Sequence, residues 1–373
     1  ATLNVSKALL FFFLNFKFKF YTNIEKVTNK PYQQYNKMAP ESVTKIRDDL
    51  KNKKTLGYGL MSFTWRANPV PIEDAITTMG ELLKVVPADT HKILFNLGEF
   101  YGEPYLNLKY AKKFIDSLDA EDKKKIFVSV KGGMDNATLA PAGTRQGIVK
   151  SVEGCLDVLG FIDIFECARI DLDHWEESFD TLIEYVEAGK IGALSLSELT
   201  KDQIEMVFNK KNYKDYIVCC ELELSLFSNK IIQDGTTEYL NNHGVSVVAY
   251  SPLGRGLLTK QIKSVKDIPK GDFRSHLKRF QDEAMAHNIK LINFLEENFT
   301  SKRDITLPQL ALAWVRKNNT IYNNINFIPI PSGTTPARVQ ENFAIKEISD
   351  EEFAKINEFL KSFTTAGDRY ETA

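Results

Sequence analysis

The feature that most constrains the fold is a regular alternation, beginning at Leu56, of short apolar runs with longer segments of helical periodicity. The apolar runs are rich in β-branched and aromatic residues, which is typical of buried strands. They cover residues 58–63, 92–98, 125–133, 161–168, 191–198, 217–225, 245–253 and 325–333. The intervening segments, such as residues 72–86 and 175–190, repeat apolar side chains every three or four positions and are predicted to be amphipathic helices.

Eight strands that alternate with helices predict an α/β protein with a (β/α)8 TIM barrel, here a single domain over residues 46–373. An open doubly wound sheet is the rival fold, but no G-x-G-x-x-G motif follows the first strand. Residues 1–45 are set aside as an N-terminal extension, because residues 8–21 are apolar, then basic and aromatic, without the pattern of the barrel. The long segment after residue 254 is expected to begin as a loop that acts as a lid and to continue as a helix.

Composition argues against several kinds of binding partner and site. Lys and Arg total 48 and Asp and Glu total 49, so no basic excess indicates nucleic acid. The four cysteines have neither zinc nor C-x-x-C spacing, which predicts no metal site and a reducing compartment. No run is long enough to span a bilayer. We expect a cytoplasmic protein, with the nucleus as an alternative and mitochondria only if residues 1–37 are a presequence; the oligomeric state stays open.

Polar side chains gather where the predicted strands end, which is where barrel enzymes carry their chemistry. Lys131 follows an apolar strand, so its stem is expected inside the barrel mouth, where a buried ammonium needs a partner or a chemical role. Tyr101, in the loop after the second strand, could donate a proton if the neighbouring ammonium lowers its pKa. Glu166, Glu198 and Glu221 could instead be the paired carboxylates of a glycoside hydrolase.

The last predicted strand ends in the small-residue sequence PSGTT, which opens a helix. Free backbone N–H groups at a helix N-terminus form a ready anion site, and Arg338 could bind a phosphate with two hydrogen bonds. An ordinary helix cap by Thr334 or Thr335 is the alternative interpretation.

Five motifs, in order, resemble those of the aldo-keto reductases: FNLGEFYGE, VSVKGG, GKIGALSLSE, VAYSPLGRG and IPIPSGTTPARVQEN. The resemblance implies NADPH-dependent reduction of a small aldehyde, with Tyr101 as proton donor and Lys131 as its partner. It also implies that Tyr250 stacks on the nicotinamide and that Ser197 binds its carboxamide. Further cofactor contacts are implied at Glu198, Glu221, Ser251, Leu253, Ser332, Thr334, Arg338, Glu341 and Asn342.

The chain departs from the usual Asp-Tyr-Lys-His tetrad of that family. Asn96 stands at the aspartate position and Ala168 at the histidine position. These two changes together resemble the fungal pyridoxal reductases, which act in vitamin B6 metabolism. We expect Ala168 to open space for a larger substrate, with Glu166 and Arg169 as charged contacts nearby.

Two expectations concern the rest of the pocket. Trp65 is a candidate ring-stacking wall for the substrate, with ordinary core packing as the alternative. Because Asn96 carries no charge, either Glu99 or Glu221 is expected to balance the Lys131 ammonium. Two other functions stay open: an aldehyde reductase of broader range, and a regulatory barrel that binds NADPH with little turnover.

Overall fold

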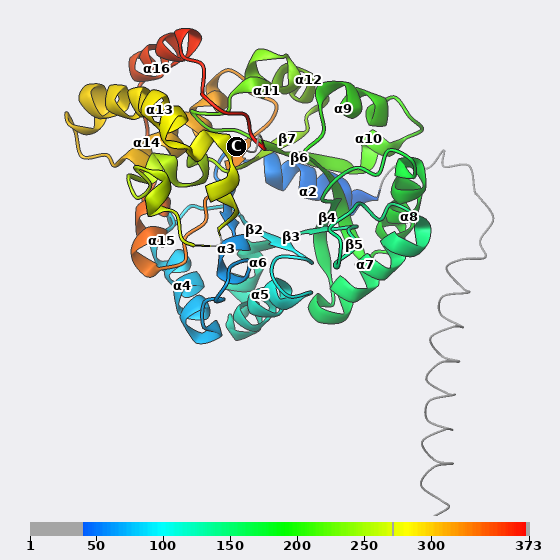
Figure 1. Ribbon diagram of the computed structural model, residues 1–373. Coiled ribbons are helices and arrows are strands. Elements are labelled where there is room, and N and C mark those ends of the chain that lie inside the picture. Colours follow the sequence, from blue (N-terminus) through cyan, green and yellow to red (C-terminus); the bar gives the residue numbers. More distant parts are fainter. Residues whose placement is uncertain (1–39, 271, 371–373) are drawn as a thin grey trace, which may run out of the picture. The chain divides into compact units, whose positions relative to one another are not determined.

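The computed structural model describes residues 40–270 and 272–370 and places eight parallel strands in one sheet, in the order β1 to β8 (Figure 1). The strands are β1 Leu56–Gly59, β2 Ile93–Gly98, β3 Ile126–Gly132, β4 Ile162–Cys167, β5 Ile191–Ser197, β6 Ile217–Glu223, β7 Ser246–Tyr250 and β8 Phe327–Pro329. The Gly59 N–H donates to the Pro331 carbonyl at 3.1 Å, which joins β1 to the residues that follow β8. The predicted (β/α)8 barrel is therefore confirmed.

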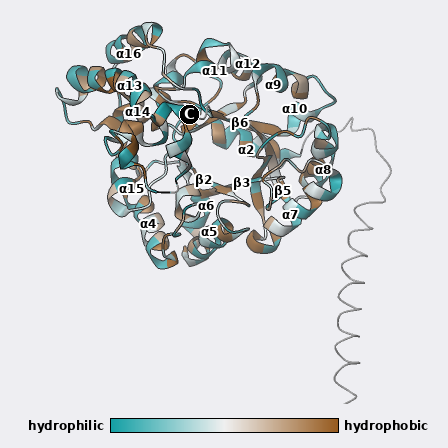
Figure 2. Cartoon of the chain, viewed as in Figure 1, coloured by the Kyte–Doolittle hydropathy of each residue, from teal (hydrophilic) through white to brown (hydrophobic). Residues whose placement is uncertain are grey.

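Helices surround the sheet, with their hydrophilic faces turned outward (Figures 1 and 2). The longer helices are α2 Glu41–Lys51, α4 Ile72–Val85, α5 Leu106–Ser117, α7 Arg145–Leu159, α8 Trp175–Glu187, α9 Lys201–Phe208, α12 Thr236–His243, α13 Asp282–Leu295, α14 Leu307–Lys317, α15 Pro336–Phe343 and α16 Asp350–Ser362. The shorter ones are α3 Met61–Thr64, α6 Ala120–Lys125, α10 Tyr213–Tyr216 and α11 Lys230–Gln233. Among the described residues, no helix combines the length and apolarity needed to cross a membrane.

The first strand differs from its sequence prediction, because it covers residues 56–59 and not 58–63. A side chain on Gly57 would meet Ile330 and Ile328 of the closing segment within 3 Å, and one on Gly59 would meet the Ile330 carbonyl at 2.8 Å. These glycines let β1 approach the closing segment closely, and the strand therefore begins at Leu56, two residues before its predicted start. The following residues Met61–Thr64 then form a helical turn.

Helix α2 lies against the N-terminal ends of the strands and contacts β5, β6 and β7. Its Arg47 donates to the Asp215 and Ile217 carbonyls at 2.8 and 3.1 Å, where β6 begins. The helix starts at Glu41 and buries Val43, so these residues belong to the fold although the sequence reading set residues 1–45 aside. The rest of that range, residues 1–39, lies outside the described part of the chain.

The long segment between β7 and β8 begins with four short 3₁₀ turns, Gly254–Thr259, Val265–Asp267, Phe273–His276 and Lys278–Phe280. Helix α13 and the π-helical turn Glu296–Thr300 follow, so the expected sequence of loop and helix is observed. Arg338 of α15 donates to the Gln261 side chain and ties the loop to the helix after β8.

Asn107 at the start of α5 holds the end of β2 in place. Its Oδ1 accepts from the Gly98 N–H at 3.2 Å, and its Nδ2 donates to the Leu60 carbonyl at 3.0 Å and the Thr64 hydroxyl at 2.9 Å. The side chain is fully buried, so its removal leaves buried polar groups unsatisfied.

We predict that Asn107→Ala lowers the free energy of unfolding by about 1–3 kcal/mol, because each unsatisfied buried group carries a desolvation penalty of that order. Urea unfolding followed by circular dichroism measures the change. Asn209→Ala, at an exposed position just after α9, is the control and should lie within about 0.5 kcal/mol of the parent. Equal stability of the two variants would contradict the assigned role of Asn107.

Candidate active site

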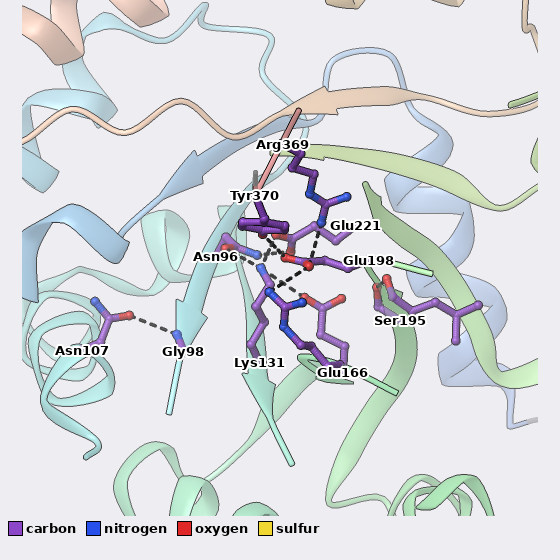
Figure 3. A network of polar contacts seen from close by, with 12 residues as sticks. Asn96, Gly98, Asn107, Lys131, Glu166, Ser195, Glu198, Glu221, Arg369 and Tyr370 are labelled. Carbon is purple, nitrogen blue, oxygen red and sulfur yellow. Dashed lines mark hydrogen bonds and ion pairs between the residues drawn. The ribbon is translucent and has the colours of Figure 1, made fainter. Parts of the chain in front are cut away.

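Three polar side chains, from β2, β4 and β6, meet around the Lys131 ammonium inside the barrel (Figure 3). The Lys131 Nζ donates to Asn96 Oδ1 at 3.2 Å and forms a direct ion pair with Glu221. Glu166 lies 3.4 Å from the same nitrogen, and the Asn96 amide donates to the other Glu221 oxygen at 2.7 Å. The side chains of Lys131, Glu166 and Glu221 are 7%, 1% and 3% exposed, so the charges interact away from bulk water.

The Lys131 side chain keeps its positive charge although it is buried. Burial alone would lower its pKa, but the charge of Glu221, with smaller contributions from the Tyr101 and Glu166 side chains, raises the pKa well above its ordinary value. Glu221 therefore performs the charge balancing for which the sequence offered Glu99 or Glu221.

Glu99 has a different environment from the one expected. Its carboxylate accepts hydrogen bonds from Ser151 and, at 2.9 Å, from Asn136. These partners hold the loop after β2 against α7 and the segment after β3. The structure thus places Glu99 in a supporting position and Glu221 beside the ammonium.

Tyr101 lies in the loop that follows β2, with Lys131 Nζ 6.0 Å from the centre of its ring. The sequence suggested that Lys131 lowers the tyrosine pKa. Burial is the larger effect, however, and it raises the pKa above its ordinary value although Lys131 opposes the change. The expected direction of the net shift was therefore wrong, and Tyr101 is held in its protonated form, as a proton donor requires.

The walls beside Tyr101 are apolar. Phe100, Tyr101, Met134 and Ala168 form one buried cluster. Trp65 is 45% exposed, meets Phe100 edge-on at 5.8 Å and lies 5.5 Å from the Tyr101 ring. Trp65 is thus not an ordinary core residue, and its role as a ring-stacking wall for the substrate stays a prediction.

Glu166 and Arg169, which are close in sequence, face different environments. Glu166 points into the barrel on β4, whereas Arg169 is half exposed at the mouth and pairs with Glu198 at 3.2 Å. Ala168 lies between them, 6% exposed, with its N–H donating to the Gly132 carbonyl at 2.9 Å. Of the three residues expected to act together, Glu166 and Ala168 are therefore buried, and Arg169 lies at the rim.

The C-terminal tail supplies residues that the sequence reading missed. The Arg369 guanidinium pairs with Glu198 at 2.7 Å and Glu223 at 3.4 Å, and it lies 5.0 Å from the centre of the Tyr250 ring. The Tyr370 hydroxyl donates to Glu198 at 3.0 Å (Figure 3). No periodicity or motif marks this Arg-Tyr pair, because its partners lie far away in the chain.

Several residues expected to hold a cofactor line the rim formed by β5, β7 and the end of β8. Among the described residues, the buried hydroxyl oxygens of Ser197, Ser332 and Tyr250 have no hydrogen-bond partner, so they are available to a polar ligand. Glu198 and Ser251 have φ angles of 60° and 50°, a left-handed backbone conformation that residues other than glycine rarely adopt. Such strain is concentrated at functional sites.

The helix that follows β8 begins with the ordinary threonine cap that the sequence offered as the alternative to an anion site. Thr335 caps α15 by accepting from the Arg338 N–H, and Pro336 occupies the first turn. Arg338 is exposed, while Asn342 is buried and donates to the Ser332 carbonyl at 3.3 Å. The remaining expected contacts lie on the same side of the barrel: Leu253 is buried, and Thr334 and Glu341 are partly exposed.

Comparison with known proteins identifies the family. Residues 55–361 match the sequence profile of the aldo/keto reductase family, and the chain belongs to it. A relative in Saccharomyces cerevisiae, named "Putative pyridoxal reductase", is 45% identical over 344 residues, which cover 87% of this chain and 99% of the relative. A Schizosaccharomyces pombe protein, named "Probable pyridoxal reductase 2", is 30% identical over 327 residues, or 84% and 94% of the two chains.

Solved structures agree with the fold. The glycerol dehydrogenase from Gluconobacter oxydans matches with a TM-score of 0.66 at 21% identity, covering 86% of this chain and 95% of that one. An aldo-keto reductase from Klebsiella pneumoniae in complex with NADPH matches with a TM-score of 0.58 at 17% identity, covering 82% and 90%. The site described above thus belongs to an aldo-keto reductase.

We predict that Glu221→Gln shifts the alkaline limb of the rate–pH profile of aldehyde reduction to lower pH by about one unit. Loss of the direct carboxylate lets burial lower the Lys131 pKa, so the ammonium is lost earlier as pH rises. Steady-state rates up to about pH 11 measure the effect, and the parent should show little decline there because its Lys131 pKa lies well above the ordinary value of about 10.4. Glu99→Gln is the matched control, and an equal shift in both variants would contradict the assignment of Glu221.

Proposed function

We propose that this protein reduces pyridoxal to pyridoxine with NADPH, and so takes part in vitamin B6 metabolism. The observation that carries the proposal is the pairing of the buried Tyr101 phenol with the Lys131 ammonium beside the small side chain of Ala168. The similarity to the two yeast proteins named as pyridoxal reductases supports the same substrate.

The residues present fit NADPH. The unpartnered hydroxyls of Ser197 and Ser332 can bind its carboxamide and phosphate groups, and the Tyr250 ring can pack on the nicotinamide. The N-terminus of α15 and the exposed Arg338 suit the adenosine 2′-phosphate. When bound, NADPH supplies a hydride to the aldehyde carbon.

Tyr101 then donates its phenolic proton to the carbonyl oxygen as negative charge develops there. The phenolate that remains is stabilised by the neighbouring Lys131 ammonium, whose charge is in turn maintained by Glu221. Asn96 fixes this arrangement, because its amide bridges the ammonium and the carboxylate. The chain thereby replaces the usual aspartate at position 96 with an amide and a carboxylate from β6.

The substrate enters between Trp65 and the cluster that contains Ala168. Pyridoxal is a flat, polar ring, so an aromatic wall can stack on it and the rim charges can meet its polar groups. A histidine at position 168 would occupy this space. The small side chain therefore supports a substrate with a substituted ring.

Loss of nicotinamide absorbance with purified protein, NADPH and pyridoxal tests the proposal. We expect Tyr101→Phe to lower kcat/KM by about 10²–10⁴, because it removes the proton donor, while NADPH affinity stays unchanged. Tyr322→Phe, in a tyrosine packed on Phe327 away from the strand ends that bear the site, is the control. Tight NADPH binding without turnover by the parent protein would instead indicate a regulatory barrel.

A second variant tests the role of the small side chain at position 168. We predict that Ala168→His lowers kcat/KM for pyridoxal by about tenfold or more, a barrier change of about 1.4 kcal/mol, because the imidazole occupies the space of the ring substituents. The kcat/KM for benzaldehyde should fall much less, and Ala168→Ser should keep the kcat/KM values of the parent protein. An equal loss for both aldehydes would show that position 168 does not select the substrate.

A further inference from the structure

Glu166 has an unusual environment that the catalytic steps above do not explain. The residue is 1% exposed, and among the described residues neither of its carboxyl oxygens has a well-formed hydrogen bond. Lys131 Nζ lies 3.4 Å away, and the Glu221 carboxyl and the Ser195 hydroxyl lie within hydrogen-bonding reach. A buried carboxylate without hydrogen bonds is strongly destabilising, so the neutral acid is the favoured form.

The charges of the cluster lead to the same conclusion. One ammonium, that of Lys131, faces two carboxyl groups, those of Glu221 and Glu166, and two carboxylates that share one buried site do not both ionise. Glu221 is in direct contact with the ammonium and also accepts from the Asn96 amide. Glu221 is therefore better placed than Glu166 to face the ammonium as an anion.

Other groups surround Glu166, and none of them supplies a second positive charge. They come from every neighbouring element: Tyr101 after β2, Lys131 on β3, Cys167 on β4, Ser195 on β5, and Cys219 and Glu221 on β6. Burial, followed by the charge of Glu221, raises the pKa of the Glu166 carboxyl well above its ordinary value, and Lys131 opposes this only in part.

We propose that Glu166 is a neutral carboxylic acid in the resting enzyme and returns a proton, through Lys131, to Tyr101 after each reduction. This step rests on the proposed aldehyde reduction, which leaves Tyr101 as a phenolate. It gives the chain a proton reservoir inside the barrel, two residues before the position that Ala168 occupies.

The proton balance is complete without a further reagent. A Lys131 N–H bond breaks as an O–H bond forms on the Tyr101 phenolate, and Lys131 becomes neutral. The Glu166 O–H bond then breaks as a new N–H bond forms on Lys131, and Glu166 becomes a carboxylate. A proton from solvent restores Glu166 once product leaves the pocket, so the cycle consumes one proton for each hydride.

Infrared spectroscopy of the cofactor-free protein at neutral pH tests the resting protonation state, whether or not the proposed function holds. We expect the carbonyl-stretching band of a protonated carboxylic acid, and we expect Glu166→Gln to remove it. Glu223→Gln, a change at the buried carboxylate that pairs with Arg369, should not remove it, whereas Glu221→Gln should, because Glu166 is then the one carboxylate that faces the Lys131 ammonium. An unchanged band in Glu166→Gln, or no such band in the parent protein, would overturn the proposal.

Kinetics test the return of the proton. In Glu166→Gln the first turnover needs only the proton already on Tyr101, so the rapid phase of NADPH oxidation should keep its rate and amplitude. Later turnovers should slow by about tenfold or more, and Glu166→Asp should recover part of the loss. Equal slowing of the first and later turnovers would show a structural role and overturn the relay. Absence of turnover in the parent protein would concern the proposed function alone.

Discussion

The buried charge of Lys131 is the constraint on which the rest of the site depends. An ammonium inside a barrel is tolerated only with a compensating anion and hydrogen bonds. Here the compensation comes from β6 through Glu221, while β2 contributes only the neutral Asn96. Three strands must therefore keep their relative register for the charge to persist, and the catalytic geometry is coupled to closure of the whole barrel.

Strand β4 explains why a glutamate and an arginine flank a small residue. Alternation along the strand turns Glu166 inward, and the chain leaves the sheet before Arg169, which reaches the rim. Ala168, between them, leaves the pocket wall to aromatic neighbours. One short segment thus contributes a buried acid, a small side chain in the pocket wall and a surface charge, each at a different depth.

The sequence predicted the barrel and the position of Lys131 at its mouth, because strand-end residues of a barrel gather around one mouth. It left the carboxylate that balances Lys131 open between Glu99 and Glu221, since that choice depends on long-range packing. It misplaced β1, since the close approach of Gly57 and Gly59 to the last strand is a long-range contact. It also gave the wrong direction for the Tyr101 pKa, because burial depends on the packed walls and cannot be inferred from one neighbouring lysine.

Sequence patterns could not predict that Arg369 and Tyr370 belong to the site, because their contacts with Glu198 and Tyr250 join residues more than a hundred positions apart. Their position has a practical consequence. Any change that displaces Arg369 and Tyr370 from Glu198 would also remove the cation that lies over the Tyr250 ring, so the tail and the rim of the barrel respond together.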